Sequence, residues 1–433
     1  MHNRHTVLTV MLFPLFVSAA VCSPGTAQSD TASPVLREGF DVGRLARIDR
    51  FFEAQVAEGA VAGGVALVLR DGRTVYERAF GYADAAAQRP MTTDAIFRIA
   101  SQTKAITTVA ILMLAEEGRL GLNDPVSRYI PEFARTTVST PSDGGRDVVP
   151  AVRPITIHHL LTHTSGISYG TGADVRTDYE AIGLGPAAGR NGWYLAHRDA
   201  PVCELMARLP SVPFAAQPGD RFVYGYSTDV LGCVVERAAG VPLDRFIETR
   251  ITGPLGMHDT HFFLPPAKAP RLAAVHARAS DATVVPADTG ASGQGHYVDG
   301  PRRSFAGGAG LVSTASDYAR FLQMLLNGGE LDGVRLLAPT TVELMATNQT
   351  GTLFSPAGEG FGLGFRLLLQ PGAAGRVESV GTYSWGGAYG SSYLVDPVER
   401  LILVYLVQEQ PGFSGLGARF PLLVYQALLQ PRH

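Results

Sequence analysis

The feature that most constrains this chain is a stretch of eleven residues, 105–115, that is apolar on nearly every face of a helix. It reads AITTVAILMLA, with Thr107 and Thr108 as mild exceptions, and Gly118 ends it. A helix that is apolar all round has to be buried. The chain has 433 residues, which is enough for a core that encloses such a helix. We therefore predict one large domain, or two interleaved domains, with this helix in the interior.

The composition excludes several classes of protein. Thirty-six basic and 39 acidic residues give a net charge of −3, so no basic surface for nucleic acid is expected. Three cysteines are too few for a disulfide scaffold or for the usual zinc frameworks. The sequence contains no metal-ligand spacing, phosphate-binding loop or dinucleotide fingerprint. We therefore expect no metal, no cofactor and no nucleic-acid partner.

The first 27 residues have the pattern of a secretory signal peptide. Arg4 precedes an apolar run over residues 6–20, and small residues allow cleavage after Ala27 or after Ala20. The run is too short to be predicted as a membrane span. Cys22 raises the alternative of a lipoprotein anchor, but the residues before it, Ala-Ala-Val, suit that signal poorly. We expect a periplasmic or secreted protein without a stable membrane span.

Two cysteines remain after such an export step, Cys203 and Cys233. They could form a disulfide in an oxidising compartment. Buried free thiols are an equally good interpretation, because cysteine is often a small core residue. The sequence leaves this choice open.

Both ends of the chain contain short apolar segments separated by turn residues. Near the N-terminus, residues 42–59 have helical spacing, and residues 64–69 and 74–80 flank an Asp-Gly turn as in a β-hairpin. Towards the C-terminus, four strand-like segments and a closing helix are expected at residues 361–369, 376–383, 391–395, 401–407 and 420–429. Sequential short strands with hairpin-like links favour an antiparallel sheet.

The middle of the chain differs in composition. Residues 121–299 are rich in Pro, Gly, Asp and Arg, with helical pieces and with extended surface loops predicted over 136–152 and 264–300. The simplest architecture is α+β. Residues 40–120 and 300–433 together form an antiparallel sheet flanked by helices, and the mainly helical middle region is inserted between them.

Ser101 lies at the start of the buried helix, and Lys104 follows one turn later. Residues i and i+3 share a helix face, so a hydroxyl and an amine stand side by side. This is the S-x-x-K arrangement of serine acyl-transfer enzymes. A serine attacks poorly until a neighbour removes its proton, and a lysine can do that when burial disfavours its charged form. Such strings also occur by chance, but Lys268 is the only other lysine in the chain, which favours a functional Lys104.

Two further segments place candidate functional groups in or beside turns. Tyr224 lies in a turn before a predicted helix at 229–239, and side chains in such turns often point into clefts. A phenol can take and return a proton when a nearby cation lowers its pKa. Gly386 and Gly387 follow Trp385, and exposed backbone N–H groups at such a glycine pair could bind an oxyanion. Taken singly, ordinary packing of the tyrosine and a β-bulge at the glycines explain these segments at least as well.

Together these segments resemble one family. The order IASQTK, YGYSTDVLG and WGGAYG, with LLTHTSGI and GGAGLVSTASDYARFLQMLLNGG between them, is similar to that of the serine β-lactamases and penicillin-binding proteins. The resemblance is strongest to the family VIII carboxylesterases, which are related in fold to class C β-lactamases, and it spans residues 40–430 approximately. It implies that Ser101 is the nucleophile and that Lys104 and Tyr224 share the general-base and general-acid work. The implied oxyanion hole consists of the backbone N–H groups of Ser101 and Ala388.

The sequence departs from the lactam-processing members of this family at two places. Those members usually carry Lys-Thr-Gly or His-Thr-Gly where this chain has Trp385-Gly386-Gly387, and they usually have Asn where Tyr226 stands. We expect these four residues to contact the substrate. Aromatic surface in place of polar anchors favours neutral esters. The predicted function is therefore an exported serine hydrolase that cleaves short-chain carboxylic esters through an acyl-Ser101 intermediate.

Other interpretations remain. The chain could be a β-lactamase or D,D-peptidase acting on lactams or peptidoglycan stems, or a non-catalytic penicillin-binding-like module, which the combined presence of Ser101, Lys104 and Tyr224 disfavours. Ser168 lies in a G-x-S-x-G string, which is the nucleophile motif of α/β-hydrolases, and His163 could then be the base. That motif needs a strand before it and a helix after it, whereas loop residues surround Ser168. The sequence alone determines neither the natural substrate nor the oligomeric state.

Overall fold

The computed structural model describes residues 35–432, except residues 190, 191, 282, 289, 291, 292 and 413. The predicted signal peptide and Cys22 lie outside the described residues. Residues from Val35 onward form one compact unit. None of the described helices is long and apolar enough to cross a membrane.

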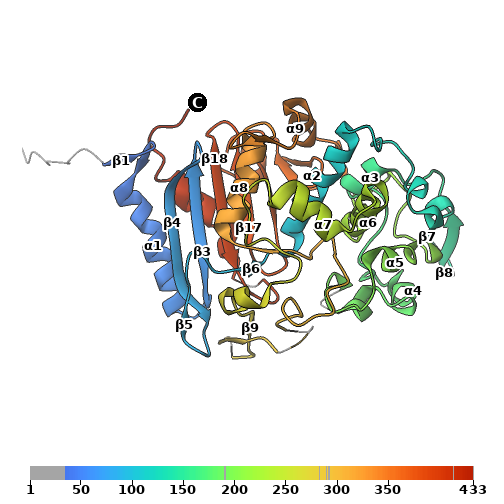
Figure 1. The fold of residues 1–433 in the computed structure, drawn as a ribbon, viewed down its shortest axis with the longest axis horizontal. Coiled ribbons are helices and arrows are strands. Elements are labelled where there is room, and N and C mark those ends of the chain that lie inside the picture. The colour runs from blue at the N-terminus through green and yellow to red at the C-terminus, as the bar shows by residue number, and fades with distance from the viewer. Residues whose placement is uncertain are drawn as a thin grey trace, which may run out of the picture. The chain divides into compact units, whose positions relative to one another are not determined.

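An eight-stranded antiparallel sheet joins the two ends of the chain, which confirms the predicted α+β class (Figure 1). Its strand order is β14-β15-β16-β17-β18-β3-β4-β5. The strands are β3 (Gly63–Arg70), β4 (Arg73–Asp84), β5 (Arg89–Pro90), β14 (Glu359–Phe361), β15 (Arg366–Leu368), β16 (Tyr383–Gly386), β17 (Ser392–Asp396) and β18 (Leu401–Val407). The central pairing runs from Leu401 opposite Arg70 to Val407 opposite Gly64.

The hairpin of β3 and β4 forms where the Asp-Gly turn predicted it. Asp71 and Gly72 have φ angles of 52° and 75°, the left-handed values that a type I′ hairpin turn requires at both central positions. Five further strand pairs of the described residues lie outside the large sheet, one of which is the hairpin of residues 137–150 described below. The other four are shorter. They are β1 (Leu36–Arg37) with β2 (Phe40–Asp41), β6 (Phe97–Arg98) with β11 (Val312–Ser313), β9 (His276–Arg278) with β10 (Val284–Pro286), and β12 (Glu330–Leu331) with β13 (Val334–Arg335).

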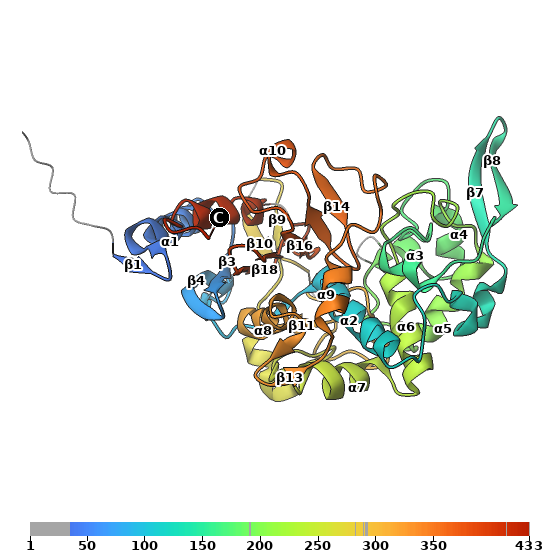
Figure 2. The same cartoon turned by 90° about the horizontal axis from the view of Figure 1, so that it is seen from above.

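Helices cover both faces of the sheet, and Figure 2 shows α1 and α8 on opposite sides of it. One face packs against α1 (Val42–Ala57) and α11 (Phe420–Tyr425), and the other packs against α2 (Thr103–Glu116) and α8 (Ala315–Leu326). Successive residues of β18 alternate between the two cores, since Leu403 belongs to the first and Val404 to the second. A strand that is buried on both faces has no polar positions, which explains the continuous run LILVYLV.

The middle of the chain forms a cluster of short helices beside the sheet. They are α3 (Ile157–Leu161), α4 (Arg176–Ala181), α5 (Val202–Met206), α6 (Ser227–Ala239) and α7 (Leu243–Ile247), which continues into a π-helical turn (Glu248–Thr252). A disulfide between Cys203 and Cys233 joins α5 to α6. The structure thus favours the paired alternative for these two cysteines.

Two predicted loops contain strands. Residues 136–152 were expected to be a surface loop, but they form the hairpin of β7 (Thr137–Ser142) and β8 (Gly145–Pro150), which projects beside the helical cluster (Figure 2). β-branched residues in both arms and the Asp-Gly pair at 143–144 account for this hairpin, because they favour strands and a tight turn. Within the predicted loop 264–300, β9 and β10 form a second short hairpin.

Two of the four predicted C-terminal strands differ from the prediction, whereas 391–395 and 401–407 correspond to β17 and β18. The expected strand 376–383 is wrong, because α10 (Pro371–Ala374) and a loop precede β16, which begins only at Tyr383. The expected strand 361–369 is divided into β14 and β15. The division occurs at Gly364, whose φ is 87° and whose absent Cβ would lie 2.4 Å from the hydroxyl of Thr108. The remaining described helix of this region is α9 (Pro339–Met345).

Candidate active site

Ser101 lies where the chain enters the buried helix. Residues Ala100–Gln102 form a 3-10 turn that continues into α2. Every residue of α2 from Thr103 to Leu114 is buried, as the apolar pattern predicted. The hydroxyl of Tyr318 donates to the carbonyl of Gln102 at 2.9 Å, which holds the entry of the helix against α8. Ser101 is therefore fixed at the exposed end of a rigid element.

The amine of Lys104 lies beside Ser101, in an environment closed to water. Only 1% of Lys104 is exposed. Its Nζ atom is 3.3 Å from Ser101 Oγ, 3.0 Å from Tyr169 Oη and 2.7 Å from the carbonyl oxygen of Gly308. A neutral amine has two hydrogens and one lone pair. It can donate to Tyr169 and Gly308 while its lone pair accepts the proton of Ser101, as a general base must.

Tyr224 lies on the other side of this amine, in the loop before α6. The centre of its ring is 4.7 Å from Lys104 Nζ. Its hydroxyl accepts a hydrogen bond of 3.1 Å from the indole N–H of Trp385. The structure therefore brings together Ser101, Lys104, Tyr224 and Trp385, which the sequence placed in three separate segments. Lys104 contacts the serine oxygen directly, while the Tyr224 hydroxyl engages Trp385.

The glycine pair after Trp385 lets the end of β16 approach the serine. A Cβ atom on Gly387 would lie 2.6 Å from the carbonyl oxygen of Ile99, whereas one on Gly386 would meet only the carbonyl oxygen of Ser391, at 3.1 Å. Gly387 is thus required for close contact with the turn that carries Ser101. Ser101 and Ala388, the two residues of the implied oxyanion hole, line the same cavity.

This cavity has a volume of about 650 Å³. Ser101 lines it together with four large aromatic residues, Tyr169, Trp193, Tyr224 and Trp385. The cavity is also lined by residues of β15 to β18, of the loop before β16, and of α11 and the segment before it, namely Arg366, Arg376, Ser384, Ser392, Tyr393, Leu394, Leu403, Gly417, Ala418, Phe420 and Pro421. The cavity is large enough for a small organic substrate.

Two cations line this cavity that the sequence analysis did not anticipate, but both are paired. The guanidinium of Arg366 donates to Ser384 Oγ at 2.9 Å and lies 3.3 Å from a carboxylate oxygen of Glu359. Arg376 forms an ion pair of 2.7 Å with Glu378. Each positive charge is therefore compensated within the wall. Burial lowers the pKa of Arg366, although the charge of Glu359 opposes this shift.

Tyr226 does not line the cavity, so the expectation that it contacts the substrate needs correction. Its side chain is fully buried. Its hydroxyl accepts from the N–H of Gly185 at 3.1 Å and donates to the carbonyl of Gly192. The ring packs edge-on against Tyr169 at 4.9 Å. Tyr226 thus supports Tyr169 from behind, because its position two residues after Tyr224 turns it into the helical cluster.

Tyr169 is a site residue that sequence reasoning missed. It lies inside the G-x-S-x-G string, next to Ser168, whose Oγ accepts the N–H of Gly170 at 3.0 Å and so belongs to a local turn. Burial raises the pKa of Tyr169 well above its ordinary value, so the phenol stays protonated. No pattern in the sequence distinguishes this tyrosine from others in loops, because its partner Lys104 is 65 positions away.

Asp229 is a second residue that was missed. It is buried in the first turn of α6, and its Oδ1 accepts the N–H of Gly308 at 3.0 Å. The carbonyl of the same Gly308 accepts from Lys104. Burial raises the pKa of Asp229 to about 6, while the charge of Lys104 opposes the rise. The sequence held one signal for Asp229, a carboxylate on the apolar face of a predicted helix. Because an isolated charge is costly to bury, such a carboxylate indicates a buried polar partner.

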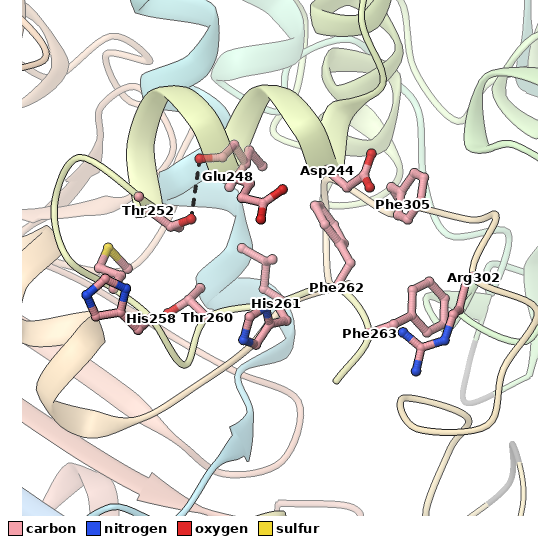
Figure 3. A pocket seen from close by; sticks show the side chains of 14 residues that line it. Asp244, Glu248, Thr252, His258, Thr260, His261, Phe262, Phe263, Arg302 and Phe305 are labelled. Carbon is pink, nitrogen blue, oxygen red and sulfur yellow. Dashed lines mark hydrogen bonds between the residues drawn. The ribbon is translucent and has the colours of Figure 1, made fainter. Parts of the chain in front are cut away.

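A second cavity, of about 370 Å³, lies around α7 and its π-helical continuation and does not include Ser101 (Figure 3). Three phenylalanines line it together with polar groups that include Asp244 and His261. The described residues contain no group of three or more His, Cys, Asp or Glu side chains that could hold a metal ion.

Comparisons with known proteins show which family this chain is similar to. The Beta-lactamase family model matches residues 48–426. Protein Rv1367c of Mycobacterium tuberculosis is 38% identical over 371 residues, covering 82% of this chain and 88% of that protein. Esterase EstB of Burkholderia gladioli is 35% identical over 399 residues, covering 88% and 94%.

Among solved structures, EstCE1, described as a hydrolase with promiscuous acyltransferase activity, superposes with a TM-score of 0.73. It is 30% identical to this chain, and the match covers 90% of this chain and 99% of EstCE1. The fold, the ordered motifs and the family match lead to the same assignment. The chain belongs to the β-lactamase family.

Proposed function

We propose that this protein is an exported serine hydrolase that cleaves short-chain carboxylic esters through an acyl-Ser101 intermediate. The observation that carries the proposal is the contact of 3.3 Å between the buried amine of Lys104 and Ser101 Oγ, at the edge of a cavity with aromatic walls. The similarity to a protein named an esterase supports the same class of reaction.

The proposed reaction has two halves. Lys104 takes the proton of Ser101 as the serine oxygen attacks the ester carbonyl, and the backbone N–H groups of Ser101 and Ala388 bind the oxyanion. Tyr224 and Lys104 return the proton to the departing alkoxide, so that an alcohol leaves and acyl-Ser101 remains. Water then attacks the acyl group by the reverse proton path, which releases the carboxylic acid and restores the serine.

The substrate class follows from the walls of the cavity. Trp385 occupies the position where lactam-processing relatives usually place a cation, and its indole N–H is engaged by Tyr224. The two arginines that line the cavity are paired with carboxylates or a hydroxyl. A neutral acyl or aryl group gains from burial against the aromatic side chains, whereas a carboxylate finds no unpaired cation among the described lining residues.

Export is part of the proposal because two observations agree with it. The first 27 residues have the pattern of a signal peptide. The disulfide between Cys203 and Cys233 is of a kind that persists in oxidising compartments. A periplasmic or secreted location would satisfy both.

The nucleophile can be tested directly. A fluorophosphonate probe should label the purified protein at Ser101, as peptide mass spectrometry would show, and Ser101→Ala should abolish both the labelling and the hydrolysis of 4-nitrophenyl butyrate. Ser168→Ala is the matched control, because Ser168 is a turn residue, and it should keep both. Labelling at Ser168, or none at all, would contradict the proposal, and the latter result would favour a non-catalytic module.

Acyl transfer to an alcohol is a second candidate activity. The specific observation is the similarity to EstCE1, whose description names a promiscuous acyltransferase activity. An alcohol that enters the aromatic cavity could replace water in the second half of the reaction. Formation of benzyl butyrate from vinyl butyrate and benzyl alcohol by the wild-type protein, and not by Ser101→Ala, would support it.

A further inference from the structure

His163 lies behind Tyr224 in an unusual conformation. Its side chain is 1% exposed, and its φ angle is 54°. Residues other than glycine rarely adopt left-handed values, and where they do the surrounding structure has to enforce them. Here the backbone is held on both sides, since the His163 N–H donates to Leu160 and the following Thr164 N–H donates to His159 at 2.9 Å. The surrounding hydrogen bonds therefore hold His163 in this conformation.

Two parts of His163 contact the segment of Tyr224. Its carbonyl oxygen accepts the N–H of Val223, the residue before Tyr224, at 2.7 Å. Its imidazole ring lies 4.7 Å from the Tyr224 ring, measured between ring centres. On its other sides the imidazole meets Phe222 at 5.7 Å and Phe361 at 5.8 Å. The imidazole thus fills the space between Tyr224 and an aromatic cluster.

The imidazole itself is not a proton carrier. Burial lowers the pKa of His163 well below its ordinary value, so the ring stays neutral. Its Nδ1 atom is buried and has no hydrogen-bond partner among the described residues. Its contribution to this site is therefore its shape and position.

We infer that His163 is a positioning residue that sets the phenol of Tyr224 for proton delivery to the leaving group; this rests on the proposed function. Lys104 and Trp385 each contact Tyr224, and the imidazole of His163 packs against the same ring. Without the imidazole the phenol ring can tilt away from the line between Lys104 and the departing oxygen. A displacement of about 1 Å in such a group can cost about a hundredfold in rate.

The leaving group provides a readout that a merely structural role would not change. Ethyl butyrate and 4-nitrophenyl butyrate give the same acyl-enzyme. Breaking the C–O bond of the first releases ethoxide, which needs a proton from Tyr224 as it leaves, whereas nitrophenolate leaves as a stable anion. Loss of correct positioning should therefore reduce kcat/KM for the ethyl ester far more than for the nitrophenyl ester.

The test compares His163→Gly and His163→Asn with the wild-type protein. Both replacements tolerate a positive φ, so the backbone contact with Val223 is retained while the ring is removed. We expect kcat/KM on ethyl butyrate to fall about 10- to 100-fold, a distinctly smaller loss on 4-nitrophenyl butyrate, and the same selective loss in Tyr224→Phe. His158→Asn is the control, because His158 lies on the neighbouring turn and contacts Gln349 instead, and it should keep the wild-type ratio.

The outcomes separate the two proposals. If the wild-type protein is labelled at Ser101 and hydrolyses both esters, while folded His163→Gly or His163→Asn keeps the wild-type ratio of the two kcat/KM values, the inference about His163 is overturned alone. If the wild-type protein is neither labelled nor active on either ester, the proposed function is overturned and the inference fails with it. Thermal unfolding of each variant confirms that a folded protein is being compared.

Discussion

At the scale of single residues, the arrangement around Lys104 decides which chemistry is available. Three oxygen atoms surround its Nζ atom, from Ser101, Tyr169 and Gly308. Tyr169 stays protonated and Gly308 offers a carbonyl, so neither can take the serine proton. Lys104 is the group that can, provided that it is present as the neutral amine.

Replacing Lys104 with arginine tests this assignment. A guanidinium stays protonated in proteins and cannot accept the serine proton, so Lys104→Arg should lower kcat/KM for 4-nitrophenyl butyrate by about 10²- to 10⁴-fold. Steady-state kinetics and the rate of fluorophosphonate labelling both report the loss. Lys268→Arg, which changes the only other lysine, at a site paired with Asp259, should retain activity. An active Lys104→Arg enzyme would refute the proposed base.

Asp229 gives a prediction about stability and pH. Its pKa is raised from 3.8 to about 6 in the folded protein, so between these values the folded state holds a proton that the unfolded chain has released. The free energy of unfolding therefore falls as the pH rises through this window, by about 3 kcal/mol from this group. Asp229→Asn should show a flatter pH dependence between pH 4 and 6 in urea unfolding. An unchanged slope would mean that Asp229 does not titrate there.

The same residues show what sequence reasoning could reach. Ser101 and Lys104 were identified because their relation is local, one helical turn apart. The relation of Tyr169 to Lys104 is made only by folding, and no spacing rule exists for it. Tyr226 was misplaced because a residue two positions from a cleft-lining side chain can face either way in a turn, and the structure buries it in the helical cluster.

At the scale of elements, the site depends on the contact between the end of β16 and the 3-10 turn that precedes α2. Gly387 permits this contact, because its Cα lies where any Cβ would collide with Ile99. The turn after β16 can then place the Ala388 N–H beside Ser101, as the proposed oxyanion hole requires.

Replacing each glycine of the pair with alanine in turn tests whether the close contact at Gly387 is what the site requires. Gly387→Ala should push β16 away from the serine and weaken one oxyanion donor, a loss worth about 10²- to 10³-fold in kcat. Gly386→Ala adds the same methyl group where it meets only the carbonyl oxygen of Ser391, so its loss should be much smaller. The comparison uses kcat for 4-nitrophenyl butyrate, and equal losses in both variants would contradict the proposed role of Gly387.

Elements with a strong local pattern were predicted well, and those shaped by distant contacts were not. The β3–β4 hairpin and α2 follow from the Asp-Gly turn and from an all-apolar stretch. By contrast, β14 and β15 are separated at Gly364, which packs against Thr108 of α2, a contact invisible in the local sequence. The β7–β8 hairpin was mistaken for a loop because its proline and glycine content masked the β-branched residues.

At the scale of the whole molecule, the site exists because one sheet joins the two ends of the chain. β16 and the segment leading to α2 become neighbours only when the C-terminal strands pair with β3. The helical middle region then supplies Tyr169 and Tyr224 from the opposite side. The fold class was predictable from the order of the motifs, and the same motifs name segments that meet at the cavity, but the composition of the cavity wall required the folded structure.

The cavity as a whole leads to a prediction about substrate choice. A charge-assisted hydrogen bond to a ligand carboxylate is worth about 1.5–3 kcal/mol, and without such a bond the preference for an anionic lactam weakens by about ten- to a hundredfold. Trp385 supplies no cation, and Arg366 and Arg376 are already paired. We therefore expect kcat/KM for 4-nitrophenyl butyrate to exceed that for a chromogenic cephalosporin by at least this factor.

Slow turnover of the cephalosporin would agree with this expectation, because a lactam carbonyl can use the same nucleophile, base and oxyanion hole. The comparison needs enzyme of known active fraction, which titration of Ser101 with the fluorophosphonate provides. Both substrates should lose turnover together in Ser101→Ala, which shows that one site acts on both. A kcat/KM on the cephalosporin equal to or above that on the ester would mean that the aromatic wall does not set the substrate class, and a β-lactamase would then describe the protein better.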